Sequence, residues 1–178
     1  NSKIFSNHAR SGGGLSLSAY NGELRGCYIY SNTNFDGPGN QVSFRSGTAT
    51  MRSCIIRDSL SYGSSVIDFC EGSTAIIENT PIFSNNQNGD QGVFYSWYNS
   101  NPILTNITVV NTSGSTGPLL TFAPPAHFTI SNSIAFGFSM ISGTGITAQY
   151  SRFDNLPSGP GNINSDPQFV DPANENYH

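Results

Sequence analysis

Short apolar stretches recur along the chain at a nearly constant interval. The clearest copies read Ile-aromatic-Ser-Asn, at 4–7, 29–32 and 82–85, and weaker copies begin at Ile56, Val109 and Ala135. Counted between the first residues of successive copies, the intervals are 25, 27, 26, 27 and 26 residues. A fixed period of this length is typical of units that cannot bury their apolar faces alone, so consecutive units must stack. The repeat therefore predicts a solenoid.

Each repeat divides into three short segments in which inward and outward side chains alternate. Alternation with a period of two residues indicates strands rather than helices. The expected inward residues of the first segment are Leu15, Leu17, Val42 and Phe44, followed by the surroundings of Val66, Val93 and Leu119. The second segment ends at Leu24, Met51, Ile77, Leu104 and Ile130, and the third centres on Ile29, Ile56, Ile82, Val109 and Ala135. We predict three strands per turn, each paired in parallel with its equivalents in neighbouring turns, and no helical segment.

Corners of two residues join the second and third segments. Three of them end in Asn79, Asn106 and Asn132, which we expect to stack as a ladder of side-chain amides. Cys27 and Cys54 follow the first two corners at equivalent positions, so they should lie about 4.8 Å apart. They are then either two stacked, buried thiols or a disulfide between turns. Cys70 is the third cysteine.

Several stretches resemble a known family. Gly-Gly-Gly-Leu-Ser-Leu at 12–17, Arg-Gly-Cys-Tyr-Ile-Tyr-Ser-Asn at 25–32 and Ser-Asn-Ser-Ile at 131–134 are similar to right-handed parallel β-helix repeat proteins of the pectate-lyase-like superfamily. The tail at 161–174 is similar to the closing segment of secreted bacterial β-helix proteins, which are often anchored at the cell surface. The resemblance implies one right-handed, three-strand β-helix domain over residues 1–178 and an extracellular or cell-surface location. We expect about six to seven turns of ~26 residues, regular over 1–150 and closed by an irregular segment at 151–178.

The composition limits the classes of partner that the chain can bind. Charged residues make up 10% of the chain, the net charge is -4, and Lys3 is the single lysine. Nucleic-acid binding requires several Lys or Arg on one face, so we exclude it. No run of about 18 apolar residues exists, so we predict no membrane span. Because the copy at 4–7 matches the late part of a repeat, we expect the natural protein to extend upstream.

The third segment carries an unusual outward column. In each Ile-aromatic-Ser-Asn copy we expect the Ile to lie in the core, the Asn to turn the corner and the aromatic residue to point outward. The resulting stripe comprises Phe5, Tyr28, Tyr30, Phe83 and Phe136. Over six turns it spans about 25 Å, longer than the apolar patch that a monomer usually exposes. Its cover is then a long turn or the C-terminal tail, a second copy of the chain, or stacked sugar rings.

The corners also carry charge. Arg25 and Arg52 should stack one turn apart, with Glu78 close enough to pair with Arg52. This arrangement is either a solvated ladder of weak ion pairs or, together with Arg57, an anion site for uronic acids.

Catalytic patterns are missing. Glycosidases need carboxylates that face one cleft, whereas the candidate acids lie on different segments: Asp36, Asp58, Asp68, Glu71 and Glu78. His8, His127 and His178 lie in turns or at the chain end. Asp154, Asp166 and Asp171 are the residues that calcium would use, but their spacing matches no calcium loop, so we predict no metal or cofactor.

Our leading hypothesis is therefore a non-catalytic extracellular β-solenoid, a structural, adhesive or filament-forming module that contacts itself or a cell-surface partner through the stripe and its stackable ends. The alternatives are a polysaccharide lyase or hydrolase and a carbohydrate-binding β-helix.

Overall fold

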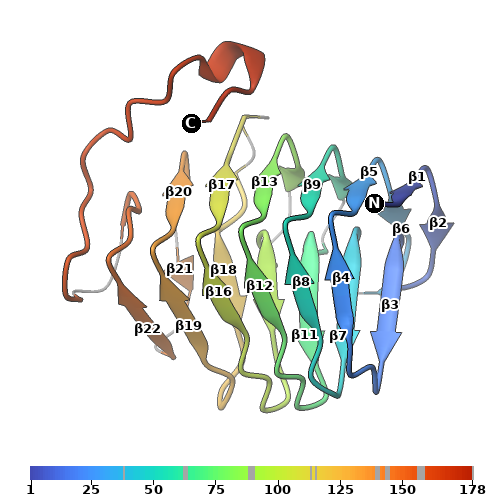
Figure 1. Ribbon diagram of the computed structural model, residues 1–178. Coiled ribbons are helices and arrows are strands. Elements are labelled where there is room, and N and C mark those ends of the chain that lie inside the picture. The colour runs from blue at the N-terminus through green and yellow to red at the C-terminus, as the bar shows by residue number, and fades with distance from the viewer. Residues whose placement is uncertain are drawn as a thin grey trace.

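The chain folds as an all-β parallel solenoid (Figure 1). The computed structural model describes residues 1–37, 39–61, 64–87, 91–112, 114, 116–138, 141–142, 145–155 and 159–177. Its one helical segment among these residues is the short 3-10 helix η1 (Pro172–Asn174). Within the same ranges, no helix is long and apolar enough to cross a membrane.

Three six-stranded parallel sheets, here called the first, second and third sheet, run along the solenoid. The first sheet contains β3 (Leu15–Ser18), β7 (Val42–Arg45), β11 (Ile67–Cys70), β15 (Phe94–Ser96), β18 (Leu120–Phe122) and β21 (Ile141–Ser142). The second contains β4 (Glu23–Arg25), β8 (Thr50–Arg52), β12 (Ile76–Glu78), β16 (Ile103–Thr105), β19 (Phe128–Ser131) and β22 (Ile146–Gln149). The third contains β1 (Lys3–Phe5), β5 (Tyr28–Tyr30), β9 (Ile55–Arg57), β13 (Pro81–Phe83), β17 (Thr108–Val110) and β20 (Ile134–Phe136).

One strand of each sheet makes a turn, so the chain completes about five turns, from β3 to β20, with β1 before them and β21 and β22 after them. Two short pairs lie beside the third sheet. They are β2 (His8–Ala9) with β6 (Thr33–Asn34), and β10 (Leu60–Ser61) with β14 (Asn86–Gln87). The predicted all-β fold and the period of about 26 residues are confirmed.

The core consists of stacked, equivalent side chains, as the pattern predicts. In the second sheet, strand pairing aligns Leu24, Met51, Ile77, Leu104 and Ile130. In the third it aligns Ile4, Ile29, Ile56, Ile82, Val109 and Ala135. Phe44 and Phe69 of the first sheet stack with ring centroids 5.5 Å apart. Each unit therefore buries its apolar face against the turns stacked on it, which is the expected behaviour of a solenoid.

The corners between the second and third sheets each contain one residue with a left-handed backbone. The φ angles are 50° at Asn79, 52° at Asn106 and 50° at Asn132. Asn adopts this conformation more readily than most residues, which explains its recurrence here. The Asn106 Nδ2 donates to Asn79 Oδ1 at 3.2 Å. The predicted asparagine ladder is thus confirmed for this pair.

The corner after the third sheet corrects one expectation. Ser31 and Ser84, not the asparagines that follow them, adopt the left-handed conformation, with φ of 54° at each. Asn32 and Asn85 point inward and are buried. Asn85 Oδ1 accepts a hydrogen bond from the Ser59 backbone N–H at 3.0 Å, one turn earlier. The Ser turns the chain, and the Asn satisfies backbone groups that the turn leaves unpaired.

The cysteines are free thiols and all three are buried. Of the two alternatives for Cys27 and Cys54, the stacked thiols are the one observed. The Cys27 N–H donates to Cys54 Sγ at 3.4 Å, and the Cys54 N–H donates to Thr80 Oγ1 at 3.3 Å. Burial raises the pKa of the Cys54 thiol. Cys54 Sγ and Thr80 Oγ1 therefore each accept a hydrogen bond from a backbone N–H of the preceding turn.

Candidate functional site

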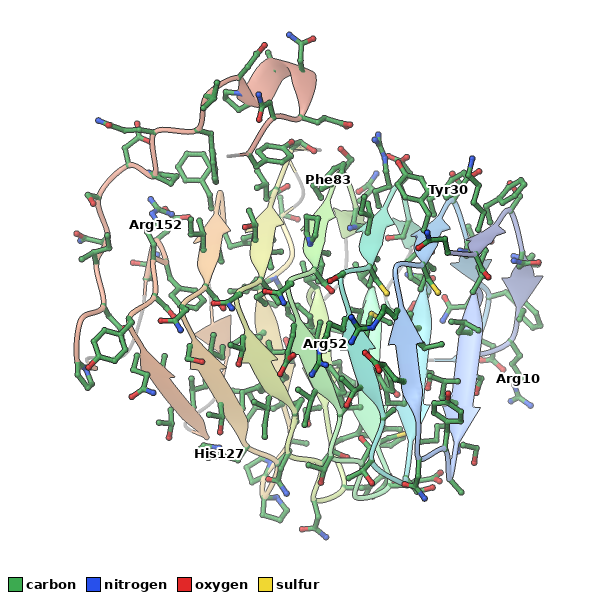
Figure 2. The ribbon with its side chains drawn as sticks, viewed as in Figure 1. Arg10, Tyr30, Arg52, Phe83, His127 and Arg152 are labelled. Atoms are coloured by element: carbon green, nitrogen blue, oxygen red, sulfur yellow. The ribbon has the colours of Figure 1, made fainter. Side chains whose placement is uncertain are left out.

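The outer face of the third sheet carries the predicted stripe. Strand pairing places Phe5, Tyr30, Arg57, Phe83, Val110 and Phe136 side by side on successive strands. Tyr30 and Phe83 lie along the same edge of the molecule in Figure 2. The outward column exists as the alternation predicts, but its two halves have different surroundings.

The C-terminal tail covers the later half of this column. In Figure 1 it passes, in red, beyond the ends of β20 and β17. Phe169 contacts Phe136 and Tyr177 at ring-centroid distances of 6.0 and 5.3 Å, and Tyr177 contacts Phe83 at 5.4 Å. Phe83 is 8% exposed as a result. Of the three covers that the sequence left open, the tail is the one observed here.

An ion pair fastens the tail to the middle of the column. Arg57 donates from Nη1 to Glu175 Oε2 at 2.5 Å and from Nη2 to Glu175 Oε1 at 2.8 Å. Asp58 binds the same guanidinium at 2.6 Å, and Ser84 Oγ donates to Glu175 at 3.0 Å. Hydrogen bonds to Asp58 and Glu175 raise the pKa of Arg57 above its ordinary value. Arg57 is therefore an internal anchor for the tail.

The earlier half of the column remains open. Phe5 and Tyr30 stack in parallel, with centroids 4.9 Å apart and an interplanar angle of 5°, and Tyr28 meets Tyr30 edge-on at 5.0 Å. Phe5 is 48% exposed. We call Phe5, Tyr28 and Tyr30 the aromatic platform. It is the part of the predicted binding stripe that the tail leaves accessible.

The charged corner column forms a ladder of ion pairs. Arg52 lies on the face toward the viewer in Figure 2 and pairs with Glu78 at 2.7 Å, as predicted. Glu23 pairs with Arg25 at 2.9 Å and lies 3.7 Å from Arg52. Sequence reasoning missed Glu23, although residues two apart on a strand share a face and the spacing of Glu23 and Arg25 was the signal. All of these charges are partly exposed, so each pair adds little stability.

The outer face of the first sheet holds a buried carboxyl that sequence reasoning did not single out. Asp68 is 0% exposed. Its Oδ1 accepts from Trp97 Nε1 at 3.0 Å, and its Oδ2 accepts from Ser43 Oγ at 3.3 Å. Burial raises the pKa of Asp68 to about 7, against hydrogen bonds from Cys70, Ser43 and Trp97 that lower it. A carboxyl so perturbed marks a candidate functional position.

The neighbours of Asp68 complete this second site. Burial and the adjacent Asp68 raise the pKa of the Cys70 thiol to about 12, so this thiol is a poor nucleophile. Arg45, which faces Cys70 across the strand pair, forms an ion pair with Glu71. The sequence signal was present, because Val-Ile-Asp-Phe-Cys at 66–70 sets one charged residue within an apolar strand.

The residues considered for calcium and for acid–base chemistry are not brought together. Asp154 pairs with Arg152 at 2.7 Å, Asp166 accepts from the Gln168 N–H, and Asp171 accepts from Asn174. Across the described ranges, no group of three or more His, Cys, Asp or Glu is placed to hold a metal ion. His8 and His127 contact Thr33 and Thr147 on neighbouring strands. His178 lies outside the described residues.

Comparison of the chain with protein-family models, with curated proteins and with solved structures finds no match. The parallel β-solenoid follows from strand order and register, and each candidate site follows from its own geometry.

Proposed function

We propose that the chain is a non-catalytic β-solenoid module of a secreted or cell-surface protein, and that its aromatic platform contacts a second copy of the chain. A right-handed β-helix of the pectate-lyase-like type is part of this proposal, on the strength of the sequence resemblance. The observation that carries it is the difference along the third sheet. Phe83 is covered by the tail, whereas Phe5 is left 48% exposed beside Tyr30.

The enzymatic alternatives receive less support from the charges. Arg25, Arg52 and Arg57 are each engaged by a carboxylate of the same chain, which leaves them poorly disposed to bind uronic acids. Four of the five candidate acids are likewise in ion pairs, and these are Asp36, Asp58, Glu71 and Glu78. Paired carboxylates are held by their partners rather than directed toward a shared cleft. Asp68 is the exception among the five.

Sedimentation velocity over a wide concentration range tests the proposal. We expect the wild-type chain to associate with rising concentration, and Phe5→Ser with Tyr30→Ser to shift the association constant by at least tenfold. Tyr150→Ser is the matched control, because Tyr150 is an exposed aromatic residue (61%) beyond the opposite end of the stack. A wild-type chain that stays monomeric throughout, or a control that weakens association equally, would overturn the proposal.

A further inference from the structure

The outer face of the first sheet also carries an aromatic cluster, away from the aromatic platform. Trp97, the single tryptophan of the chain, packs against Tyr98 with ring centroids 4.3 Å apart and against Tyr95 at 6.1 Å. Tyr98 is 61% exposed, whereas Trp97 and Tyr95 are partly buried. The cluster therefore presents an apolar surface whose inner ring is fixed and whose outer ring is open to solvent.

Asp68 fixes the position of the Trp97 indole, the inner ring of the cluster. The hydrogen bond from Trp97 Nε1 to the buried Asp68 holds the indole from below, and Ser43 holds the other carboxyl oxygen. The Trp97 backbone N–H also donates to the Phe69 carbonyl at 3.0 Å. Rigid aromatic rings whose polar atom is already satisfied lose little freedom on binding.

The backbone at Tyr98 is held in an unfavourable conformation. Its φ is 49°, in the left-handed region, where a bulky residue is uncommon. The equivalent corner positions of earlier turns hold Ala19, Ser46 and Glu71. The Gly72 N–H donates to the Tyr98 carbonyl at 2.8 Å and helps to hold this conformation. The left-handed conformation therefore belongs to this corner in the earlier turns as well, and what distinguishes Tyr98 is the large exposed ring that it places there.

The surrounding charges indicate a neutral ligand. Arg45 is already paired with Glu71, and Asp68 is itself an acid, so an anionic ligand would find no unpaired cation in this cluster. Asn99 and Asn101 follow the two rings in sequence and are exposed, and uncharged amides suit hydroxyl groups. An apolar ring face with a polar rim matches a pyranose ring, which has an apolar C–H face and a hydroxyl edge.

We propose that Trp97 and Tyr98 form a binding platform for the pyranose ring of a neutral oligosaccharide, and that Asp68 is the positioning residue that holds the indole. This site is independent of the self-association proposed above, because it lies on a different sheet and uses different residues.

Fluorescence excited selectively at tryptophan tests the site directly, since Trp97 is the single tryptophan of the chain. We expect a saturable change on titration with cellohexaose or xylohexaose and none with trigalacturonate. Tyr98→Ala should weaken binding at least tenfold, whereas Phe35→Ala, an exposed aromatic residue elsewhere (65% exposed), should leave it unchanged. Trp97→Ala, followed by affinity electrophoresis, should abolish retardation by the corresponding neutral polysaccharides. A response to neither neutral sugar, or a preference for the uronate, would overturn the proposal.

A separate experiment tests the role of Asp68. Asp68→Asn keeps an acceptor for the indole N–H and should bind sugar within about twofold of wild type, whereas Asp68→Leu removes the acceptor and should weaken binding more than fivefold. In the free protein, the emission of Trp97 should change with pH around neutrality, and Asp68→Asn should remove that change. A merely structural role would leave the Asn and Leu variants equal in affinity, and that result would overturn the assignment.

Discussion

The outer faces of the first and third sheets are built in opposite ways. On the third sheet the outward column is largely apolar, and the tail buries its later half, around Phe83 and Phe136. On the first sheet the outward column is polar, yet Asp68 within it is fully buried beneath Trp97. On a solenoid, the direction in which a side chain points does not settle whether it is exposed. What lies over the face decides which residues are available for contact.

The largest expected difference between the two faces concerns how the free energy of unfolding depends on pH. Burial raises the pKa of Asp68 from 3.8 to about 7, so the folded state keeps this proton where the unfolded chain has released it. The stabilising contribution of the protonated carboxyl is fully present below about pH 4 and is lost as the pH rises toward 7. In the wild type we therefore expect the free energy of unfolding to fall by on the order of 4 kcal/mol over this pH interval. Asp68→Asn cannot ionise, so its free energy of unfolding should not show this fall.

Urea unfolding of the two proteins at pH 4, 5.5 and 8 checks this expectation. The variant should equal or slightly trail the wild type at pH 4 and exceed it at pH 8. Arg45, Cys70 and Tyr95 also face Asp68, and they are unchanged between the two proteins. Parallel pH profiles would mean that Asp68 is solvated and that the two faces do not differ in this respect.

The two halves of the third sheet should respond differently to the same change. Phe83→Ala removes a ring that contacts Tyr177 and lies 4.9 Å from the Arg57 guanidinium, so we expect a loss of about 3 kcal/mol of unfolding free energy. Phe5→Ala removes a half-exposed ring with one stacking partner, and we expect about 0.5 kcal/mol. Thermal and urea unfolding of both variants measures the difference.

Proteolysis adds a local readout. Phe83→Ala should also speed cleavage within 166–177, since the tail loses a contact that holds it, whereas Phe5→Ala should leave this rate unchanged. Equal losses of stability in the two variants would contradict the division of the sheet into covered and open halves.

The alternation of inward and outward side chains predicted most of the fold and part of the candidate functional sites. It predicted the inward columns of the second and third sheets because each Ile or Leu meets its own equivalent one turn away, a contact fixed by the period alone. In the first sheet the strand pairing aligns Ile67, Phe94 and Leu120, one residue after the Val66, Val93 and Leu119 around which the sequence placed this segment. The pairing of Arg52 with Glu78 followed in the same way. The contacts of Arg57 with Glu175 span 118 residues and depend on where an irregular tail crosses the sheet. No periodicity encodes that path, so the tail was one of three open alternatives.

The same reasoning explains why the burial of Asp68, one of the five candidate acids, was not predicted. Its burial results from Trp97, 29 residues later in sequence, whose side chain bends back over the preceding turn. An outward Asp in an alternating strand ordinarily faces water. The packing of Trp97 from the neighbouring turn, together with Ser43, Cys70 and Tyr95, changes its environment.

The smallest effect concerns the ion pair that fastens the tail. Arg57 and Glu175 have side-chain exposures of 23% and 32%, so their charges are only partly screened by solvent. We expect a double-mutant cycle of Arg57→Ala and Glu175→Ala to give a coupling free energy of about 1 kcal/mol, decreasing with salt. Arg10 and Asp36, at 77% and 57% exposed, form the matched control, and their coupling should be close to zero. Because Asp58 remains beside Arg57 when Glu175 is removed, the guanidinium keeps one partner, and this limits the loss to the tail contact itself. Equal coupling in the two pairs would mean that the apolar contacts of Phe169 and Tyr177 hold the tail without help from charge.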